Sequence, residues 1–179
     1  MTVLNKTLKH NLILILVAVV IIALDQWTKA LIKANLNVTE TWMPLAWLAP
    51  YARITHWHNT GAAFGLFQNA NLILSIVTPI IALVILAIYQ KIPQKETLMK
   101  IALGLQFGGA IGNLIDRLNQ GYVTDFISVG RFPVFNIADS AVTVGVGLLI
   151  LAVYLEERRE KKNEAAKAAE NLPDDDGGV

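Results

Sequence analysis

The chain has 179 residues, of which 54% are hydrophobic and only 16% are charged. Soluble domains carry about a quarter charged residues, so this composition excludes an ordinary soluble protein and predicts an integral membrane protein with short loops. There is no cysteine, which excludes disulfides, thiolate metal sites and a cysteine nucleophile. The formal net charge of +1 says less than the distribution of the charges along the chain.

Four windows are apolar and long enough to span a membrane, for which a helix needs about 20 residues. They are Leu12–Leu31, Asn71–Gln90, Leu98–Ile115 and Ile137–Leu155. Pro79 in the second window predicts a kink. The alternation near "ARITHWH" predicts a short strand at residues 52–58. We therefore predict an all-α integral membrane protein with four transmembrane helices and a small outer β or irregular subdomain.

The end of the chain differs in character from the rest. Residues 1–162 are predicted to form a single membrane-embedded domain, followed by a cytoplasmic tail at 163–179. The first part of the segment "EERREKKNEAAKAAE" is rich in helix formers, so we expect it to extend the fourth helix. The terminal "PDDDGGV" offers nothing to bury and is expected to be disordered.

Basic residues predict the orientation of the spans. Ten of the 15 lysines and arginines flank the start of the first window, the connection after the second and the end of the fourth. Both termini are therefore predicted to be cytoplasmic, and the two larger loops external. The apolar outer segment "TWMPLAWLAP" is expected to form, with the strand that follows it, a cover over a cleft.

Acidic residues are scarce within residues 11–154, and four of the six converge in this topology. Asp25 and Asp116 come late in rising spans, Asp139 comes early in a descending span, and Asp125 lies in the short outer connection. All four are thus predicted at a similar depth, near the outer edge of the hydrocarbon. An aspartate inside a span costs about 2.5–3.5 kcal/mol at its centre and normally faces the bundle interior.

A structural explanation competes with a functional one for these acids. Asp25 and Lys29 have the i, i+4 spacing of a helix ion pair, and Asp116 is followed by Arg117, which could neutralise it. Asp125 and Asp139 have no basic neighbour at helical spacing, which favours a functional role. Gly104, Gly108 and Gly112 recur every four residues, a pattern that lets two helices pack closely and would bring the neighbouring polar groups together.

Weaker constellations suggest other chemistry. His56 and His58 could begin a zinc site, but no third ligand stands nearby in the sequence. Ser140 and Lys29 could form a serine–lysine pair. The main alternative function is a proton- or ion-coupled transporter, and another is a non-catalytic assembly factor. The inner halves of the spans are almost purely apolar, however, which does not favour a transport pathway.

Two adjacent carboxyl groups are suited to hydrolysing an amide. Like charges held close together cannot both ionise cheaply, so the pair shares one proton. The ionised member can then act as a general base on water, and the protonated member as a general acid. At a membrane edge, water reaches such a pair from outside and an acyl-bearing substrate reaches it from the lipid.

Five short stretches, taken together, carry a family resemblance. They are "DQWTK" at 25–29, "NTGAAFG" at 59–65, "GNLIDR" at 112–117, "GYVTDFI" at 121–127 and "FNIADS" at 135–140. Their order on a four-span chain resembles the motif set of signal peptidase II, the lipoprotein signal peptidase. Each stretch alone is a weak signal, whereas five in order are highly specific.

The resemblance implies an aspartic endopeptidase of the bacterial cytoplasmic (inner) membrane with its active site near the outer face. It would remove signal peptides from prolipoproteins by cutting before the diacylglyceryl-modified cysteine. Its catalytic pair carries over to Asp125 and Asp139. The supporting residues carry over to Asp25, Lys29, Asn59, Gly61, Asn113, Asp116, Arg117 and Asn136. No metal or organic cofactor is implied, and the expected partners are prolipoproteins and membrane lipid, without nucleic acid, for a monomeric enzyme.

Overall fold

A computed structural model describes residues 3–61 and 70–170, and the side chains of 10–61 and 70–167. The described elements are, in order, α1 (Val3–Asn35), β1 (Thr41–Trp42), β2 (Ala52–Asn59), α2 (Asn71–Tyr89), α3 (Thr97–Gln120), β3 (Val123–Val129) and α4 (Ile137–Glu170). All four helices contain a segment long and apolar enough to cross a membrane. The predicted four-span architecture is confirmed, and the predicted strand at 52–58 corresponds to β2.

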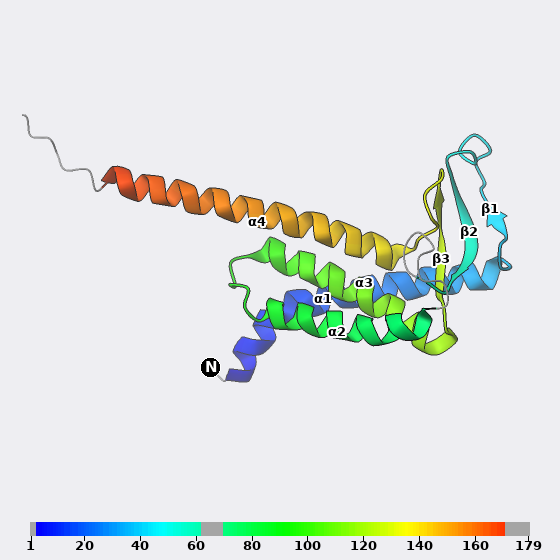
Figure 1. The fold of residues 1–179 in the computed structure, drawn as a ribbon, viewed down its shortest axis with the longest axis horizontal. Helices are drawn as coiled ribbons and strands as arrows, with labels where there is room; N and C mark the ends of the chain where they lie inside the picture. Colours follow the sequence, from blue (N-terminus) through cyan, green and yellow to red (C-terminus); the bar gives the residue numbers. More distant parts are fainter. Residues whose placement is uncertain (1–2, 62–69, 171–179) are drawn as a thin grey trace, which may run out of the picture.

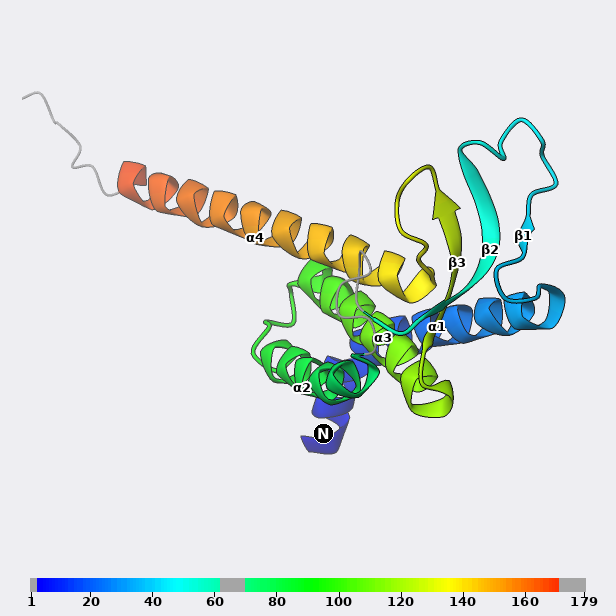
Figure 2. The same cartoon turned by 45° about the vertical axis from the view of Figure 1, so that its right-hand side comes forward.

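Helix α3 is the centre of the bundle, with α1, α2 and α4 packed around it (Figures 1 and 2). Within its most apolar window 44% of the residues are buried, against 17% in α1 and in α2 and 22% in α4. The outer three helices therefore leave large apolar side chains on the surface of the bundle. Such an apolar girdle is what a lipid-facing surface requires.

Glycines on α3 allow its neighbours to come close. A Cβ atom on Gly108 would lie 2.9 Å from the Ala18 Cα atom of α1, and one on Gly109 would lie 2.5 Å from the Ala138 carbonyl oxygen of α4. Neither position has room for a side chain without moving a backbone. The predicted close packing along the glycine stripe is thus confirmed on α1, and Gly109 extends it to α4.

The sheet lies at one end of the bundle, opposite the N-terminal end of α1 and the α2–α3 connection (Figure 1). Its strands run antiparallel in the order β1-β2-β3. Asp125 lies in the short connection between α3 and α4, as we expected, but this connection contains strand β3, which we did not predict. The reason is that most of β3 is buried, so it lacks the alternation of polar and apolar residues that marks a half-exposed strand.

At the opposite end, α1, α2 and α3 are joined by a polar cluster. The hydroxyl of Tyr89 donates to the His10 carbonyl oxygen at 2.8 Å, and the His10 ring lies 3.3 Å from the Tyr89 carbonyl oxygen. Lys100 Nζ lies 3.5 Å from His10 Nδ1, and its side chain is buried. These contacts fix the three helix ends relative to one another.

Helix α4 continues to Glu170, well beyond the bundle (Figure 2). The helical extension expected for the first part of the tail is therefore present. Residues 171–179, for which disorder was expected, lie outside the described residues.

Candidate active site

A cavity of about 1090 Å³ opens where the sheet meets α3 and the start of α4. Asp125 of β3 and Asp139 of α4 both line it, together with Asn113 and Arg117 of α3. The end of β2 and the residues after it contribute Trp57, His58, Asn59, Thr60 and Gly61. We expected topology to bring these two carboxylates together, and in the structure both face one cavity.

Asp125 is 1% exposed and receives two amide donors. Asn59 Nδ2 donates to Oδ2 at 2.8 Å, and Asn136 Nδ2 donates to Oδ1 at 2.7 Å. Burial, followed by the charge of Asp139, raises the pKa of Asp125 to about 7, although the two amide donors and Lys29 oppose this shift. A carboxyl group with this pKa can hold a proton at neutral pH.

Asp139 is held by the start of α4 itself. Its backbone N–H donates to Asn136 Oδ1 at 3.0 Å, while its Oδ2 accepts from the Asn136 backbone N–H at 3.1 Å. This reciprocal pair is a capping box, with Asn136 as the N-cap and Asp139 at the third helical position. Asn113 Nδ2 donates to the other oxygen, Oδ1, at 2.8 Å. Asp139 is only half-buried, so part of the carboxylate faces the cavity.

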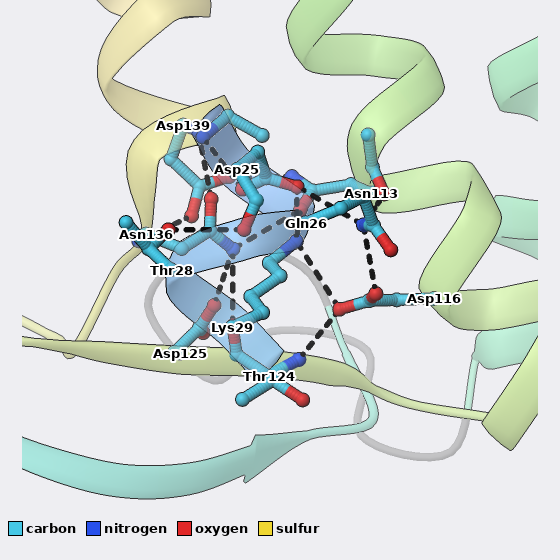
Figure 3. Close-up of polar contacts among 12 residues, drawn as sticks. Asp25, Gln26, Thr28, Lys29, Asn113, Asp116, Thr124, Asp125, Asn136 and Asp139 are labelled. Atoms are coloured by element: carbon cyan, nitrogen blue, oxygen red, sulfur yellow. Dashed lines mark hydrogen bonds and ion pairs between the residues drawn. The ribbon is translucent and has the colours of Figure 1, made fainter. Parts of the chain in front are cut away.

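Lys29 connects the polar groups behind the cavity (Figure 3). Its Nζ donates to Asp25 Oδ2 at 2.8 Å and to Asn113 Oδ1 at 3.0 Å, and it lies 3.1 Å from Asp116 Oδ2. All three charged side chains are at most 3% exposed. Because a buried charge needs partners, this one ammonium explains why the membrane-embedded end of the bundle tolerates two buried aspartates.

The remaining bonds of Asp25 and Asp116 are structural ties. Asp25 Oδ1 accepts from the Ala138 backbone N–H at 3.0 Å, which joins α1 to the first turn of α4. Asp116 Oδ2 accepts from the Thr124 backbone N–H at 3.0 Å, which joins α3 to β3 beside Asp125. These acids thus position the segments that carry Asp139 and Asp125.

The pairing of Asp116 suggested by the sequence was wrong. We considered Arg117, its neighbour, but adjacent residues on a helix point in different directions. Asp116 faces α1 and Lys29, while Arg117 faces the cavity. There Arg117 Nη2 lies 3.5 Å from the Gly61 carbonyl oxygen, a weak contact. Gly61 N–H also donates to Asn59 Oδ1 at 2.9 Å, which fixes the Asn59 amide toward Asp125.

Two residues of this network were not among the predicted site residues. Gln26 Nε2 donates to Asp116 Oδ1 at 3.1 Å and lies 3.2 Å from Asp25 Oδ2. The Thr124 backbone N–H serves Asp116 as described. Gln26 stands inside the motif at 25–29, so its polarity within an apolar span was the available signal. A backbone donor leaves no signal in the sequence.

The expected cover is formed only in part. Strand β2 and the residues after it line the cavity, but Trp42 and Trp47 do not, and they are 55% and 70% exposed. The apolar outer segment therefore extends away from the cavity. Residues 62–65 of the predicted motif at 59–65 lie outside the described residues.

The two weaker constellations differ in outcome. His56 and His58 do lie together, with ring centroids 5.1 Å apart, but the described part of the chain places no third His, Cys, Asp or Glu beside them. Burial, then His56 and then Lys33, lowers the pKa of His58, whose ring stacks on Tyr122 at 3.7 Å. The Ser140 hydroxyl donates to the Asn136 carbonyl oxygen at 2.9 Å rather than meeting Lys29. The structure therefore gives no support to a serine–lysine pair.

Comparison with solved structures defines the class of the protein. The chain is similar to two structures described as bacterial membrane enzymes. One has a TM-score of 0.74 at 35% identity and covers 80% of this chain and 88% of the other. The second has a TM-score of 0.70 at 36% identity, and the match covers 78% of this chain and 91% of the other. The chain is thus a multi-pass bacterial membrane enzyme.

Sequence relatives define the family. The family model for signal peptidase (SPase) II matches residues 17–155. The lipoprotein signal peptidase of Shouchella clausii is 47% identical over 83% of this chain and 97% of its own length. The lipoprotein signal peptidase of Moorella thermoacetica is 40% identical over 79% of this chain and 92% of its own length. The chain belongs to the signal peptidase II family, and it is a membrane protease that removes signal peptides from prolipoproteins. Nothing in these comparisons favours the transporter alternative.

Proposed function

We propose that Asp125 and Asp139 are the catalytic pair of an aspartic endopeptidase. The observation that carries this proposal is that both carboxylates line one cavity while Asn136 contacts both of them. Burial, followed by the charge of Asp139, raises the pKa of Asp125, which supports a pair that shares a proton. The reaction needs no metal ion or organic cofactor.

In the proposed mechanism the two carboxyl groups transfer protons during hydrolysis of the peptide bond. Asp139, which faces the cavity, takes a proton from water as the water oxygen attacks the scissile carbonyl carbon. Asp125, which is buried and has a pKa of about 7, gives its proton to the leaving amine nitrogen as the C–N bond breaks. One carboxyl group is protonated before and after, so the pair needs only an internal proton shift to react again.

The other predicted site residues support this pair in three ways. Asn59, Asn113 and Asn136 donate to the two carboxylates and orient them. Asp25, Lys29 and Asp116 hold together the elements that carry the pair. Arg117 and Gly61 line the cavity beside the pair, where a guanidinium can stabilise negative charge that develops on the scissile carbonyl oxygen.

The proposal also covers the position of the cleaved bond in the substrate and the location of the enzyme in the membrane. We infer cleavage directly before the diacylglyceryl-modified cysteine, because the cavity combines carboxylates with apolar lining such as Phe132, Val142 and Val144. The enzyme would work as a monomer in the bacterial cytoplasmic membrane, in contact with lipid and without nucleic acid. The distribution of lysine and arginine supports cytoplasmic termini and a site near the outer face.

A cleavage assay tests the proposal. The purified full-length protein is incubated with a diacylglyceryl-modified prolipoprotein and with the same precursor lacking the lipid. We expect the modified precursor to be cut before its cysteine and the unmodified one to remain intact. Equal cleavage of both would contradict lipid-dependent recognition, and cleavage of neither would contradict the proposed activity.

A further inference from the structure

A second cavity of about 210 Å³ lies deeper in the bundle, between α2, α3 and α4. It shares Asn113, Arg117 and Val142 with the larger cavity, so it continues that space into the membrane-spanning region. Helices α2 and α4 both pack on α3 and make few contacts with each other (Figure 2). The space is therefore a groove along α3, flanked by α2 and α4, and we call it the α2–α4 groove.

The groove contains polar groups at a depth where lipid offers no hydrogen-bond partners. Gln106 of α3 lines it, two helical turns or about 10 Å from Asn113. The side chain as a whole is only half-buried, but its Nε2 atom is enclosed and has no hydrogen-bond partner among the described residues. Rotation of the terminal amide is therefore needed to present this donor to the groove. A Cβ atom on Gly145 of α4 would lie 2.8 Å from Gln106 Cγ, so α4 leaves space only for the stem of this side chain.

A second polar group lies on the opposite wall. Thr78 of α2 lines the same groove and precedes Pro79, which cannot donate the usual backbone hydrogen bond within the helix. A buried amide without a partner destabilises the fold, because its lost hydrogen bonds to water are not replaced. A donor without a partner, facing a hydroxyl across a groove that leads to the active site, indicates a ligand that brings its own acceptor.

We propose that the α2–α4 groove binds the part of the signal peptide that runs from the active site into the bilayer, and that Gln106 donates a hydrogen bond to a backbone carbonyl oxygen of that peptide. This inference rests on the proposed function. A signal peptide has an apolar core of about 7–15 residues that must run from the catalytic cavity into the bilayer. The stretch next to the cleaved bond has to be extended to be cut, so its backbone carbonyls lose their helical partners.

The polar lining distinguishes a peptide from the other ligand that could lie here. Unwound backbone inside a membrane needs donors to satisfy its carbonyl oxygens, and the Gln106 amide supplies one. An acyl chain needs none, so a groove that held only the lipid of the substrate would be lined more favourably by apolar side chains. Gln106 thus acts as a residue that determines substrate binding and lies outside the catalytic pair.

Kinetics and direct binding test this assignment. Gln106→Met keeps the length of the side chain and removes the donor. For a lipid-modified prolipoprotein in proteoliposomes, we expect KM to rise about five- to tenfold while kcat stays within about twofold, the pattern of a lost binding hydrogen bond. Thr78→Val should raise KM in the same direction, by about two- to fivefold. The matched control is Ser75→Ala on α2, whose hydroxyl donates to its own helix at the Asn71 carbonyl oxygen; its KM should stay unchanged.

A labelled, unlipidated signal peptide and a diacylglyceryl-cysteine probe separate the possible occupants. Gln106→Met should weaken binding of the peptide about five- to tenfold and leave the lipid probe unaffected, with a melting temperature no lower than that of the wild type. Weakened binding of the lipid probe alone would assign the groove to an acyl chain, and unchanged binding of both probes would overturn the proposal. Because peptide binding does not require cleavage, this test can refute peptide binding in the groove without refuting the proposed activity, and the reverse is also true.

Discussion

Asn136 connects the two proposed catalytic carboxylates, although they lie on different elements. Its side-chain amide donates to Asp125, its backbone N–H donates to Asp139, and its side-chain oxygen caps α4. A single residue therefore sets the geometry of the acid, the base and the helix that carries the base. The arrangement predicts that Asp125 and Asp139 work as one unit.

Asparagine substitutions test that unit. Asp125→Asn and Asp139→Asn keep nearly the original shape but cannot take part in proton transfer. We expect each variant to insert into the membrane and to lose at least about a thousandfold of its cleavage rate. Since residues acting as a unit are non-additive, the double variant should be scarcely slower than either single one. Substantial activity in either single variant, normalised to folded protein, would refute the catalytic assignment.

The pKa of Asp125 predicts the pH dependence of activity. If Asp125 supplies the proton to the leaving group, kcat/KM should fall as the pH rises through about 7, where this carboxyl group ionises. The Asn59 amide lowers this pKa, so Asn59→Leu should move the alkaline limb to higher pH. Rates measured from about pH 5 to 9 check both expectations, and a flat wild-type profile would contradict them.

The same group predicts how stability depends on pH. The pKa of Asp125 rises from 3.8 to about 7 on folding, so the folded state binds the proton more tightly than the unfolded state. The resulting stabilisation is fully present below about pH 4 and is lost as the pH rises to 7. The melting temperature of the wild type should therefore fall between pH 5 and 8 more steeply than that of Asp125→Asn. Parallel slopes for the two proteins would contradict this.

At the scale of the elements, one lysine joins α1 to α3. Lys29→Met would leave Asp25 and Asp116 buried without their shared cation. Breaking a buried ion pair by removing one partner costs about 3–5 kcal/mol, so we expect a sharply lower melting temperature and poor yield. The control is Lys33→Met on the same helix, because Lys33 is exposed and contacts only Gln120 at 3.3 Å among its described bonds. Equal stability of both variants would show that the contacts of Lys29 with Asp25 and Asp116 do not stabilise the fold.

Close packing of α3 predicts a second difference between matched variants. Gly108→Ala places a methyl group against the α1 backbone, at 2.9 Å from the Ala18 Cα atom, and should cost about 1–3 kcal/mol because the helices must separate. Gly147→Ala on α4 meets nothing within 4 Å and should be neutral or slightly stabilising. Thermal denaturation in detergent measures both. A tolerant Gly108 would contradict the packing described here.

At the scale of the whole molecule, the orientation in the membrane is still a prediction. A reporter fused after Lys162 should read cytoplasmic, and one inserted near Glu40 should read external, as the asymmetry of basic residues indicates. The sheet lies at the end of the bundle opposite the α2–α3 connection (Figure 1). The backbone of Glu40 pairs with His56 of β2, and residues of β2 and β3 line the larger cavity. Reversed reporter signals would place the cavity at the cytoplasmic face and contradict the proposed mechanism.

The sequence predicted the spans because hydropathy and helix length are local properties, and it predicted the meeting of the acids because topology alone brings them to one end. It could not predict that Asp116 pairs with Lys29 on another helix, since that contact depends on the rotation of α3 about its axis. Strand β3 was missed because the alternation that marks a half-exposed strand is lost when most of the strand is buried. The groove beside Gln106 arises only where three helices meet.

The capping box at the start of α4 sets an upper temperature for activity that is lower than the melting temperature of the whole fold. Helix ends open locally at a lower free energy than the whole fold, and opening this first turn would release the Asp139 backbone N–H from Asn136. Fraying of a single helical turn would then misplace the proposed base while the rest of the bundle stayed folded. Heating should therefore abolish cleavage reversibly at temperatures below the melting transition, and amide hydrogen exchange at residues 137–139 should be faster than in the middle of the same helix.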